Sequence, residues 1–344
     1  MIRRWDLLSH FSGGAPWAAV GILLLILINV AFDLARPGGS VFGDGAFLTL
    51  SLRDGVPGGH LIDILNHASK IIILAIGMTP VIATRGIDLS VGSNMAMSGA
   101  AAAVIVGAGH SPALAITTAM LVAAACGLWN GVLVSWFGLQ PFIATLVLMV
   151  AGRGIAQMIT EGQVATFQNP TLEFIGNGRL SWLPLPFPFV LAVVVFAGTL
   201  VAVRKSALGL LLEAVGGNPV ASHLAGIRAR TLIGGSYLFC GLCAGIAGLI
   251  AMSNIKGADP FHAGLNAELA AIFAVVIGGT PLTGGRFSLL GAFLGGILMQ
   301  TLTATMYARN VSPEIAPLPQ AIVILAVCLI ASPGFRRRLS GRPA

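Results

Sequence analysis

The stretch that decides the fold is TLIGGSYLFCGLCAGIAGLIAMS, residues 231–253, which contains no charged side chain. A helix needs about 20 predominantly apolar residues to cross the hydrocarbon core of a bilayer, so this stretch predicts a transmembrane helix. Similar apolar stretches occur along the rest of the chain, near residues 17–34, 61–83, 93–109, 112–137, 141–160, 187–203, 266–280, 287–306 and 316–332. The sequence therefore predicts an all-α, polytopic membrane protein of about ten transmembrane helices, with residues 1–344 as a single transmembrane domain.

The composition supports lipid as the main solvent. The chain is 56% hydrophobic and only 9% charged, whereas a soluble domain carries about 25% charged residues. The 45 glycines are typical of transmembrane helices that pack closely. The net charge of +7 sits in short loops and near the C-terminus, which indicates membrane orientation, and we expect no nucleic-acid partner. Cys240 and Cys243 form a Cys-x-x-Cys pair within an apolar stretch, where packing is the expected role.

The distribution of cations predicts the orientation. Ten spans place both termini on one side of the membrane. That side holds Arg3, Arg4, Arg85, Arg204, Lys205, Arg228, Arg230, Arg286, Arg336, Arg337, Arg338 and Arg342, and the opposite side holds Arg36, Arg53, Arg179, Lys256 and Arg309. Because loops rich in Lys and Arg stay in the cytoplasm, we expect both termini and the loop at 204–230 to be cytoplasmic.

The loop RKSALGLLLEAVGGNPVASHLAGIRAR, residues 204–230, predicts its own short helices. Asn218 is a favoured N-cap residue, and Pro219 suits the first helical position, so a helix is expected over Pro219 to Leu224. Gly226 suits the left-handed position that follows, and Leu208 to Val215 are expected to form a preceding helix closed by Gly216 and Gly217. Val220, Leu224 and Ile227 would share one apolar face. The pair either connects two spans only or docks a cytoplasmic protein.

The same loop also resembles a known family. GGNPVASHLAGI, residues 216–227, resembles the cytoplasmic coupling segment of permease subunits in ribose-type ABC sugar importers. Three further blocks occur in the family's order, namely AIGMTPVIATRGIDLSVGS (75–93), LWNGVLVSWFGLQPFIATLVLMVAGRGIAQMITEGQ (128–163) and ELAAIFAVVIGGTPLTGGRFSLLGAFLGG (268–296). The narrower resemblance is to permeases for sugars in furanose form, including galactofuranose, on IDILNHAS (62–69), IKGADPFHAG (255–264) and GGRFSLL (284–290). One departure is Ala270, where the family often has an acidic residue.

The resemblance implies a multi-pass permease of the bacterial inner membrane that carries a monosaccharide and catalyses no reaction. Its expected partners are an ABC ATPase subunit, a second identical or homologous permease, a periplasmic sugar-binding protein and the lipid bilayer. No cofactor is expected on this subunit, because ATP and Mg²⁺ would bind to the ATPase. The residues implied to couple to that ATPase within the 204–230 segment are Glu213, Gly217, Asn218, Pro219, Val220, Ala221, Leu224 and Gly226.

Polar side chains inside spans are energetically costly and are therefore candidates for the translocation path. The candidates are Asn66, Asn94, Asn130, Gln140, Arg153, Gln157, Glu268 and Gln300, together with Asp88 and Ser90 from the interruption between the second and third spans. Each uncharged member is alternatively a hydrogen-bonding contact between helices. Lys70 and Asp63 lie seven residues apart and are expected on one helix face.

Two polar interruptions have particular interpretations. In GIDLSVGSN, residues 86–94, Gly86 is expected to end one helix, and Asp88 or Ser90 to cap the next. The alternative is a broken helix beside the substrate path, and the two are compatible. GGTPLTGGRF, residues 278–287, predicts a tight turn, since no Lys-Ser or Lys-Thr follows the glycines as in a phosphate-binding loop.

Two other functions compete with the ATP-driven importer. An ion-coupled secondary transporter would need coupling-ion ligands in the membrane, where carboxylates are sparse, and would leave the folded 204–230 segment unexplained. A membrane enzyme would need a cluster of acids or histidines. No such cluster accompanies His67 at the spacing of a catalytic or metal-binding site. The sequence does not specify which sugar is carried, nor whether the second permease is identical.

Overall fold

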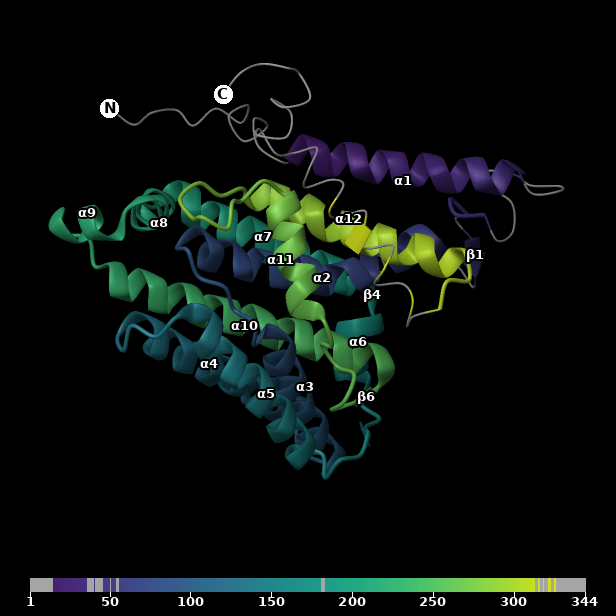
Figure 1. Ribbon diagram of the computed structural model, residues 1–344. Coiled ribbons are helices and arrows are strands. Elements are labelled where there is room, and N and C mark those ends of the chain that lie inside the picture. The colour runs from purple at the N-terminus through teal and green to yellow at the C-terminus, as the bar shows by residue number, and fades with distance from the viewer. Residues whose placement is uncertain are drawn as a thin grey trace, which may run out of the picture.

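The computed structural model describes residues 15–35, 40, 46–49, 51–53, 56–180, 183–312, 315, 318, 321–322 and 325. These residues form twelve helices and six short strands (Figure 1). The helices are α1 Ala15–Ala35, α2 His60–Ala83, α3 Val91–Gly107, α4 Pro112–Ser135, α5 Pro141–Ile159, α6 Pro170–Asn177, α7 Phe187–Lys205, α8 Leu208–Gly217, α9 Pro219–Leu224, α10 Ala229–Ile255, α11 Ala267–Ile277 and α12 Leu289–Ala308. The strands are β1 Ser51–Arg53, β2 Val56–Gly58, β3 Ala165–Thr166, β4 Arg179–Leu180, β5 Leu183–Pro186 and β6 Gly257–Ala258, paired antiparallel as β1–β2, β3–β6 and β4–β5.

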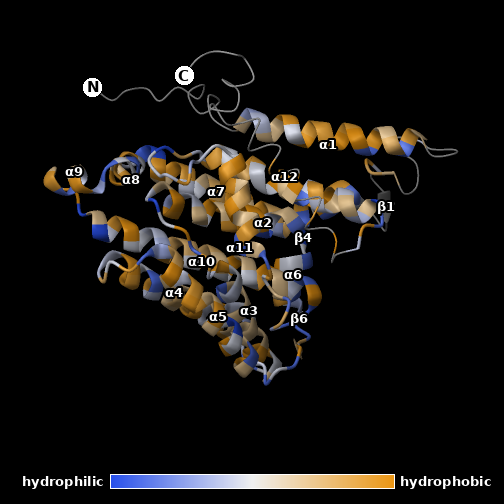
Figure 2. Cartoon of the chain, viewed as in Figure 1, coloured by the Kyte–Doolittle hydropathy of each residue, from blue (hydrophilic) through white to orange (hydrophobic). Residues whose placement is uncertain are grey.

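Helices α2, α10 and α12 form the centre of the bundle. More than half of the apolar window of each is buried, compared with 11% for α7 and 22% for α1. The main core cluster joins Met78, Val91, Tyr237, Ala274 and Leu302 from five helices. The peripheral helices instead expose apolar side chains, as Figure 2 shows for α1, which is the arrangement expected where lipid covers the outside.

Glycine allows α4 and α10 to pack backbone against backbone. A Cβ atom on Gly127 would lie 2.6 Å from the carbonyl oxygen of Tyr237, and one on Gly241 would lie 2.6 Å from that of Ala123. Lipid supplies no hydrophobic force between helices, so such close contacts and the dispersion energy they provide hold the bundle together. The high glycine content of the chain therefore has a packing role at this interface.

Seven of the described helices are long and apolar enough to cross a membrane, namely α1, α2, α4, α5, α7, α10 and α12. The predicted spans at 93–109 and 266–280 correspond to α3, with 17 residues, and to α11, with 11, both fewer than the about 20 residues that cross the hydrocarbon core. Each of these helices begins after a non-helical segment, residues 84–90 before α3 and residues 259–266 before α11. The predicted tenth span, 316–332, lies largely outside the described residues, so the count of ten and the cytoplasmic placement of both termini stay predictions.

The two ends of the bundle differ. Figure 1 shows α8 and α9 at one end and β1, β4, β6 and α6 at the other. Helix α10 connects the two ends, since it begins at Ala229, five residues after α9 ends at Leu224, and ends at Ile255, next to β6. Its 27 residues span about 40 Å at 1.5 Å per residue, enough to cross a bilayer. We call these the α9 end and the β6 end.

Candidate functional site: the coupling segment and the polar interior

The 204–230 segment folds locally as its sequence predicts. Helix α9 covers Pro219 to Leu224, and the Asn218 side chain accepts a hydrogen bond from the backbone N–H of Ala221 at 3.0 Å. Gly226 adopts the left-handed conformation with φ of 81°. Helix α8 begins at Leu208 as predicted, but it extends to Gly217 and thus includes the two glycines expected to close it. The predicted cap, first turn and closing glycine are confirmed.

Helix α9 presents apolar side chains without cover from the rest of the described chain. Leu224 is 83% exposed and Val220 is 69% exposed, whereas Ile227 is half-buried. Figure 2 shows this short helix as an apolar projection at its end of the molecule. Val220 and Leu224 are thus available to another molecule, whereas Ile227, which follows α9, is partly covered by the described chain.

The C-terminal end of α8 packs tightly against the end of α2 and the 278–287 turn. A Cβ atom on Gly216 would lie 1.8 Å from the carbonyl oxygen of Ala83 and 2.5 Å from the amide nitrogen of Gly285. The Gly285 amide in turn donates to the Ala83 carbonyl at 2.8 Å. Three segments distant in sequence therefore meet backbone to backbone, and glycine is required at Gly216 for this approach.

The Arg85 side chain also contributes to the contact between the end of α8 and the end of α2. Its Nε donates to the carbonyl oxygen of Gly216, and its Nη2 donates to that of Gly217. These carbonyls belong to the last turn of α8, where carbonyl groups have no partner within the helix. A cation at a helix C-terminus is also favoured by the helix dipole. We call the contact among Ala83, Arg85, Gly216, Gly217 and Gly285 the α2–α8 junction.

Glu213 attaches α8 to the same turn. Burial raises the pKa of this carboxyl, while the backbone N–H of Phe287, which donates to it, and the charge of Arg286 act in the opposite direction. Ionised Glu213 thus has a hydrogen-bonding partner and an opposite charge on residues that follow the glycines of the turn. Glu213 and the α2–α8 junction together fix α8 to the 278–287 turn.

The turn at 278–287 is a tight backbone turn, as predicted. Gly279, Gly284 and Gly285 all have positive φ angles, of 94°, 77° and 91°. Thr280 is fully buried, and its hydroxyl accepts from the backbone N–H of Ser288, which caps α12 through a bond to the Gly291 amide. The turn therefore links the end of α11, the start of α12 and the junction.

The residue that ends α2 differs from the one predicted. Arg85, with φ of 67°, takes the left-handed position, and the Gly86 amide donates to the Val81 carbonyl at 2.9 Å. Gly86 is needed for space, because a Cβ atom there would lie 2.5 Å from the Tyr237 hydroxyl oxygen. The expectation that Gly86 itself breaks the helix was wrong, since close packing against α10 rather than backbone freedom explains this glycine.

Asp88 lies at the centre of a buried polar cluster. Its Oδ1 accepts from the Ser90 amide at 2.9 Å, from the Ser90 hydroxyl at 2.6 Å and from the Asn130 Nδ2 at 3.3 Å. Asn130 also donates to the Ser90 hydroxyl at 2.8 Å, and all three side chains are at most 1% exposed. Asp88 thus accepts from the N–H of Ser90, the N-cap residue of α3, whereas the Ser90 side chain makes no capping bond to the helix. We call these residues the Asp88 cluster.

Neighbouring helices hold the non-helical segment that carries Asp88. The Ile87 carbonyl accepts from the Tyr237 hydroxyl at 3.3 Å and from the Thr145 hydroxyl at 3.4 Å. The segment is therefore anchored to α10 and α5. Irregular backbone between transmembrane helices is tolerated when its polar groups are satisfied within the protein, and this arrangement agrees with the broken-helix interpretation of residues 86–94.

The starts of the two short helices approach each other in the interior. A Cβ atom on Gly92, in the first turn of α3, would lie 2.3 Å from the Gly264 carbonyl oxygen and 2.4 Å from a Glu268 carboxyl oxygen. Glu268 lies in the first turn of α11. Arg153 of α5 reaches the same region, since its Nη1 donates to the carbonyls of Ala263 and Pro260. Glu268 and Arg153 thus come from separate helices to one region beside the start of α3.

Two candidate path residues connect helices. Asn94 is buried and donates to the carbonyls of Ala123 and Gly241, each at 3.3 Å, which links α3 to α4 and α10. Asn66 donates to the Gly176 carbonyl at 3.1 Å and accepts from the Asn254 side chain at 3.2 Å. Asn66 and Asn94 therefore form hydrogen bonds between helices, which was the alternative to a role in the translocation path.

Lys70 belongs to the network around Asn66. Its Nζ donates to the Asn254 side chain at 3.0 Å and lies 3.4 Å from His67 Nδ1. Asp63 is exposed in the first turn of α2. The contacts of Lys70 therefore join α2 to the β6 end of α10.

The three glutamines are not brought together with the Asp88 cluster. Gln140 is exposed in the connection between α4 and α5, so its assignment to a span was wrong, because α5 begins one residue later at Pro141. Gln157 is half-buried on α5, and Gln300 is half-buried on α12.

The Cys-x-x-Cys pair is buried on α10, where Cys240 hydrogen-bonds to Asp88 and Cys243 packs against Gly77.

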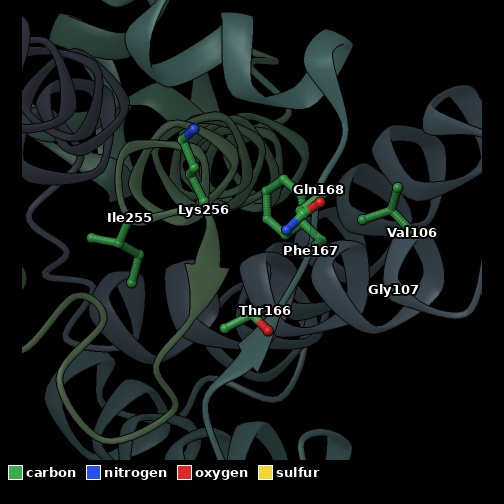
Figure 3. Close-up of a pocket in the computed structure, with 7 residues that line it drawn as sticks. All are labelled: Val106, Gly107, Thr166, Phe167, Gln168, Ile255 and Lys256. Carbon is green, nitrogen blue, oxygen red and sulfur yellow. The ribbon is translucent and has the colours of Figure 1, made fainter.

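A groove lies at the β6 end. It has a volume of about 470 Å³, and its lining comes from the end of α3, the β3 segment and the end of α10 (Figure 3). The lining residues are Val106, Gly107, Thr166, Phe167, Gln168, Ile255 and Lys256. Lys256 forms an ion pair with Glu173 of α6 at 2.7 Å, which ties α6 to the rim.

Sequence reasoning missed the role of Arg85, which it counted only as an orientation signal. Its partners are 131 and 132 residues away, so no local pattern could have identified them. Tyr237 was missed for the same reason, because its hydroxyl contacts a backbone carbonyl 150 residues away. The only available signal was position, since Arg85 directly follows an apolar span.

Comparison with known proteins identifies the family. The profile described as "Branched-chain amino acid transport system / permease component" matches residues 60–331. The chain is 45% identical to the galactofuranose transporter permease of Escherichia coli (strain K12) over 94% of this chain and 91% of the relative. It is 38% identical to the fructose import permease of Bifidobacterium longum (strain NCC 2705), over 94% and 88%, and 37% identical to the ribose import permease of E. coli (strain K12), over 79% and 85%.

No solved structure matches the chain. The family profile covers most of the chain, from the start of α2 to beyond α12, and thus includes the 204–230 segment, the Asp88 cluster and the 278–287 turn. The match and the membrane-spanning helices agree with the resemblance noted in the four sequence blocks. The chain therefore belongs to the family of transport-system permease components, the non-catalytic membrane subunits of binding-protein-dependent importers.

Proposed function

We propose that this permease is the membrane-spanning subunit of an ATP-driven sugar importer of the bacterial inner membrane. Its cargo is a monosaccharide, with furanose-form sugars such as galactofuranose as the first choice, because the galactofuranose permease is 45% identical over nearly the whole chain. Ribose and fructose are the named cargoes of the other two relatives. The cargo class is thus supported by three related permeases.

The observation that carries this proposal is the capped, apolar helix α9 at one end of the bundle. Leu224 is 83% exposed and Val220 is 69% exposed on a helix of only six residues, which leaves an apolar face for another molecule. An apolar helix face of this kind fits a groove on a partner protein. We assign that partner as an ABC ATPase subunit, which binds ATP and Mg²⁺ and contacts Pro219, Val220, Ala221 and Leu224.

The remaining partners follow from the two ends of the bundle. A periplasmic sugar-binding protein delivers sugar to the β6 end, and a second permease, identical or homologous, completes the translocation path. Within this chain we place the path beside the starts of α3 and α11, where Glu268 lies next to Gly92 and Arg153 bonds to the loop before α11. The Asp88 cluster, in which Asn130 of α4 joins Asp88 and Ser90, lies just before the start of α3. Hydroxyl groups of a sugar suit such hydrogen-bonding groups.

The test is reconstitution of the permease with its candidate ATPase and binding protein in proteoliposomes. ATP hydrolysis should rise with sugar-loaded binding protein, and labelled sugar should accumulate only with ATP. Competition with galactofuranose, ribose and fructose identifies the preferred cargo. Uptake that continues without any ATPase subunit would refute the proposal in favour of an ion-coupled transporter.

The matched variants are Leu224→Asp and Val164→Asp. Both place a carboxylate at an exposed apolar position, but Val164 lies at the β6 end. We expect Leu224→Asp to abolish ATPase binding in co-purification while membrane insertion persists, and Val164→Asp to retain ATPase binding. Retention of the ATPase by Leu224→Asp would show that the α9 face is not the docking surface.

A further inference from the structure

The α2–α8 junction places Arg85 between the coupling segment and the polar interior. On one side its guanidinium group holds the carbonyls of Gly216 and Gly217, the residues immediately before the Asn218 cap of α9. On the other side its backbone is three residues from Asp88. A displacement of the end of α8 therefore acts directly on the chain that leads into the Asp88 cluster.

The segment between Arg85 and Asp88 has little freedom to absorb such a displacement. Gly86 is packed against Tyr237 so closely that a Cβ atom would lie 2.5 Å from the hydroxyl oxygen. Ile87 is held through its carbonyl by Tyr237 and Thr145. Packed interiors respond to force by switching between discrete arrangements rather than by gradual deformation, so movement at Arg85 must be accompanied by rearrangement at Asp88.

Arg85 also connects the coupling segment to the turn between α11 and α12. A Cβ atom on Gly284 would lie 2.4 Å from Cγ of Arg85, and the Gly285 amide donates to the Ala83 carbonyl. The turn begins directly after α11, whose first turn carries Glu268 at the opposite end of that helix. Both segments that reach the interior, residues 84–90 and α11, are thus linked to α8 at one point.

We propose that Arg85 is the positioning residue that transmits movement of the α8–α9 segment to the Asp88 cluster and to α11. This inference rests on the proposed function, because it assumes that the ATPase acts on α9. It assigns a specific side chain to the transmission step. Lysine can retain the positive charge but not the pair of directed donors that arginine supplies to two adjacent carbonyls.

The first test needs only the permease. Hydrogen–deuterium exchange is compared among the wild type, Arg85→Ala and Arg204→Ala, where Arg204 is an exposed arginine in the last turn of α7 at the same end of the bundle. Arg85→Ala should exchange faster in peptides covering residues 84–90 and 208–217, whereas Arg204→Ala should not. Unchanged exchange in both peptides of Arg85→Ala would overturn the proposal whether or not an ATPase partner exists.

The second test uses the reconstituted importer. We expect Arg85→Ala to bind the ATPase and to hydrolyse ATP in response to sugar-loaded binding protein, while sugar carried per ATP falls by about tenfold, the scale of a typical coupling free energy between two sites. The amount of sugar carried per ATP by Arg85→Lys should lie between the values for Arg85→Ala and the wild type. The value for Arg204→Ala should match that of the wild type. The assignment would be overturned if Arg85→Ala carried as much sugar per ATP as the wild type. It would also be overturned if Arg85→Ala lost ATPase binding together with transport. A wild type that binds no ATPase would instead refute the proposed function.

Discussion

At the residue scale, two neighbouring glycines have different structural roles. Gly216 has no room for a methyl group between α8 and the end of α2, whereas a Cβ atom on Gly217 would meet no described atom within 4 Å. Both are in α8, so replacement by alanine changes helix propensity similarly at each position. The comparison therefore isolates the packing at the α2–α8 junction.

We expect Gly216→Ala to destabilise the detergent-solubilised permease by about 1–3 kcal/mol, the usual cost of overpacking, and Gly217→Ala to change stability by less than about 0.5 kcal/mol. Thermal unfolding followed by tryptophan fluorescence measures the difference. Equal midpoints for the two variants would show that α8 is not packed on Ala83 in solution.

At the scale of elements, α9 is too short to be stable by itself. Isolated helices below about 12 residues are marginal in water, so a helix of six residues depends on its cap and its surroundings. Asn218 supplies that cap through the Ala221 amide. Asn169 performs the same function for α6 at the β6 end, where it accepts from the amides of Thr171 and Leu172.

We expect Asn218→Ala to weaken α9 by about 1 kcal/mol, the typical value of an N-cap, and to reduce ATPase affinity accordingly. Hydrogen–deuterium exchange over residues 219–224 and titration of the ATPase measure the two effects. Asn169→Ala is the control, since it should accelerate exchange in α6 but leave ATPase affinity unchanged. If Asn218→Ala bound the ATPase as tightly as the wild type, a preformed α9 would not be needed for docking.

At the scale of the whole molecule, we expect the two ends of the bundle to face opposite sides of the membrane. Helix α10 leads from the α9 end to the groove at the β6 end (Figures 1 and 3). The excess of Lys and Arg in the loops of the α9 end predicts that this end is cytoplasmic.

This sidedness can be measured with single cysteines in a cysteine-free background. Leu224→Cys should react with a membrane-impermeant maleimide only in inverted vesicles, and Gln168→Cys only in right-side-out vesicles. Both positions are exposed, so lack of access would not explain a negative result. Reaction of both cysteines from the same side would contradict a bundle that spans the membrane between α9 and the groove.

The sequence by itself determined the features that depend on neighbours in the chain. Apolar length predicts the membrane spans because a helix satisfies its own backbone hydrogen bonds in lipid. Asn218, Pro219 and Gly226 predict α9 because capping, a fixed proline φ and the left-handed conformation are properties of a few adjacent residues. For the described helices these expectations agree with the structure to within two residues, except that α11 ends at Ile277 rather than near residue 280.

Only the tertiary structure decided which polar residues act together. Asp88 and Ser90 form hydrogen bonds with Asn130, which is about 40 residues away in the sequence. Gln140, Gln157 and Gln300 carry the same amide group as Asn130 but lie elsewhere in the bundle. Arg85 reaches Gly216 and Gly217 because helix packing brings α8 to the end of α2. Glu268 of α11 lies beside Gly92 of α3 because helix packing brings the first turns of these two helices together. Such contacts depend on how distant helices pack, which local periodicity and capping do not encode.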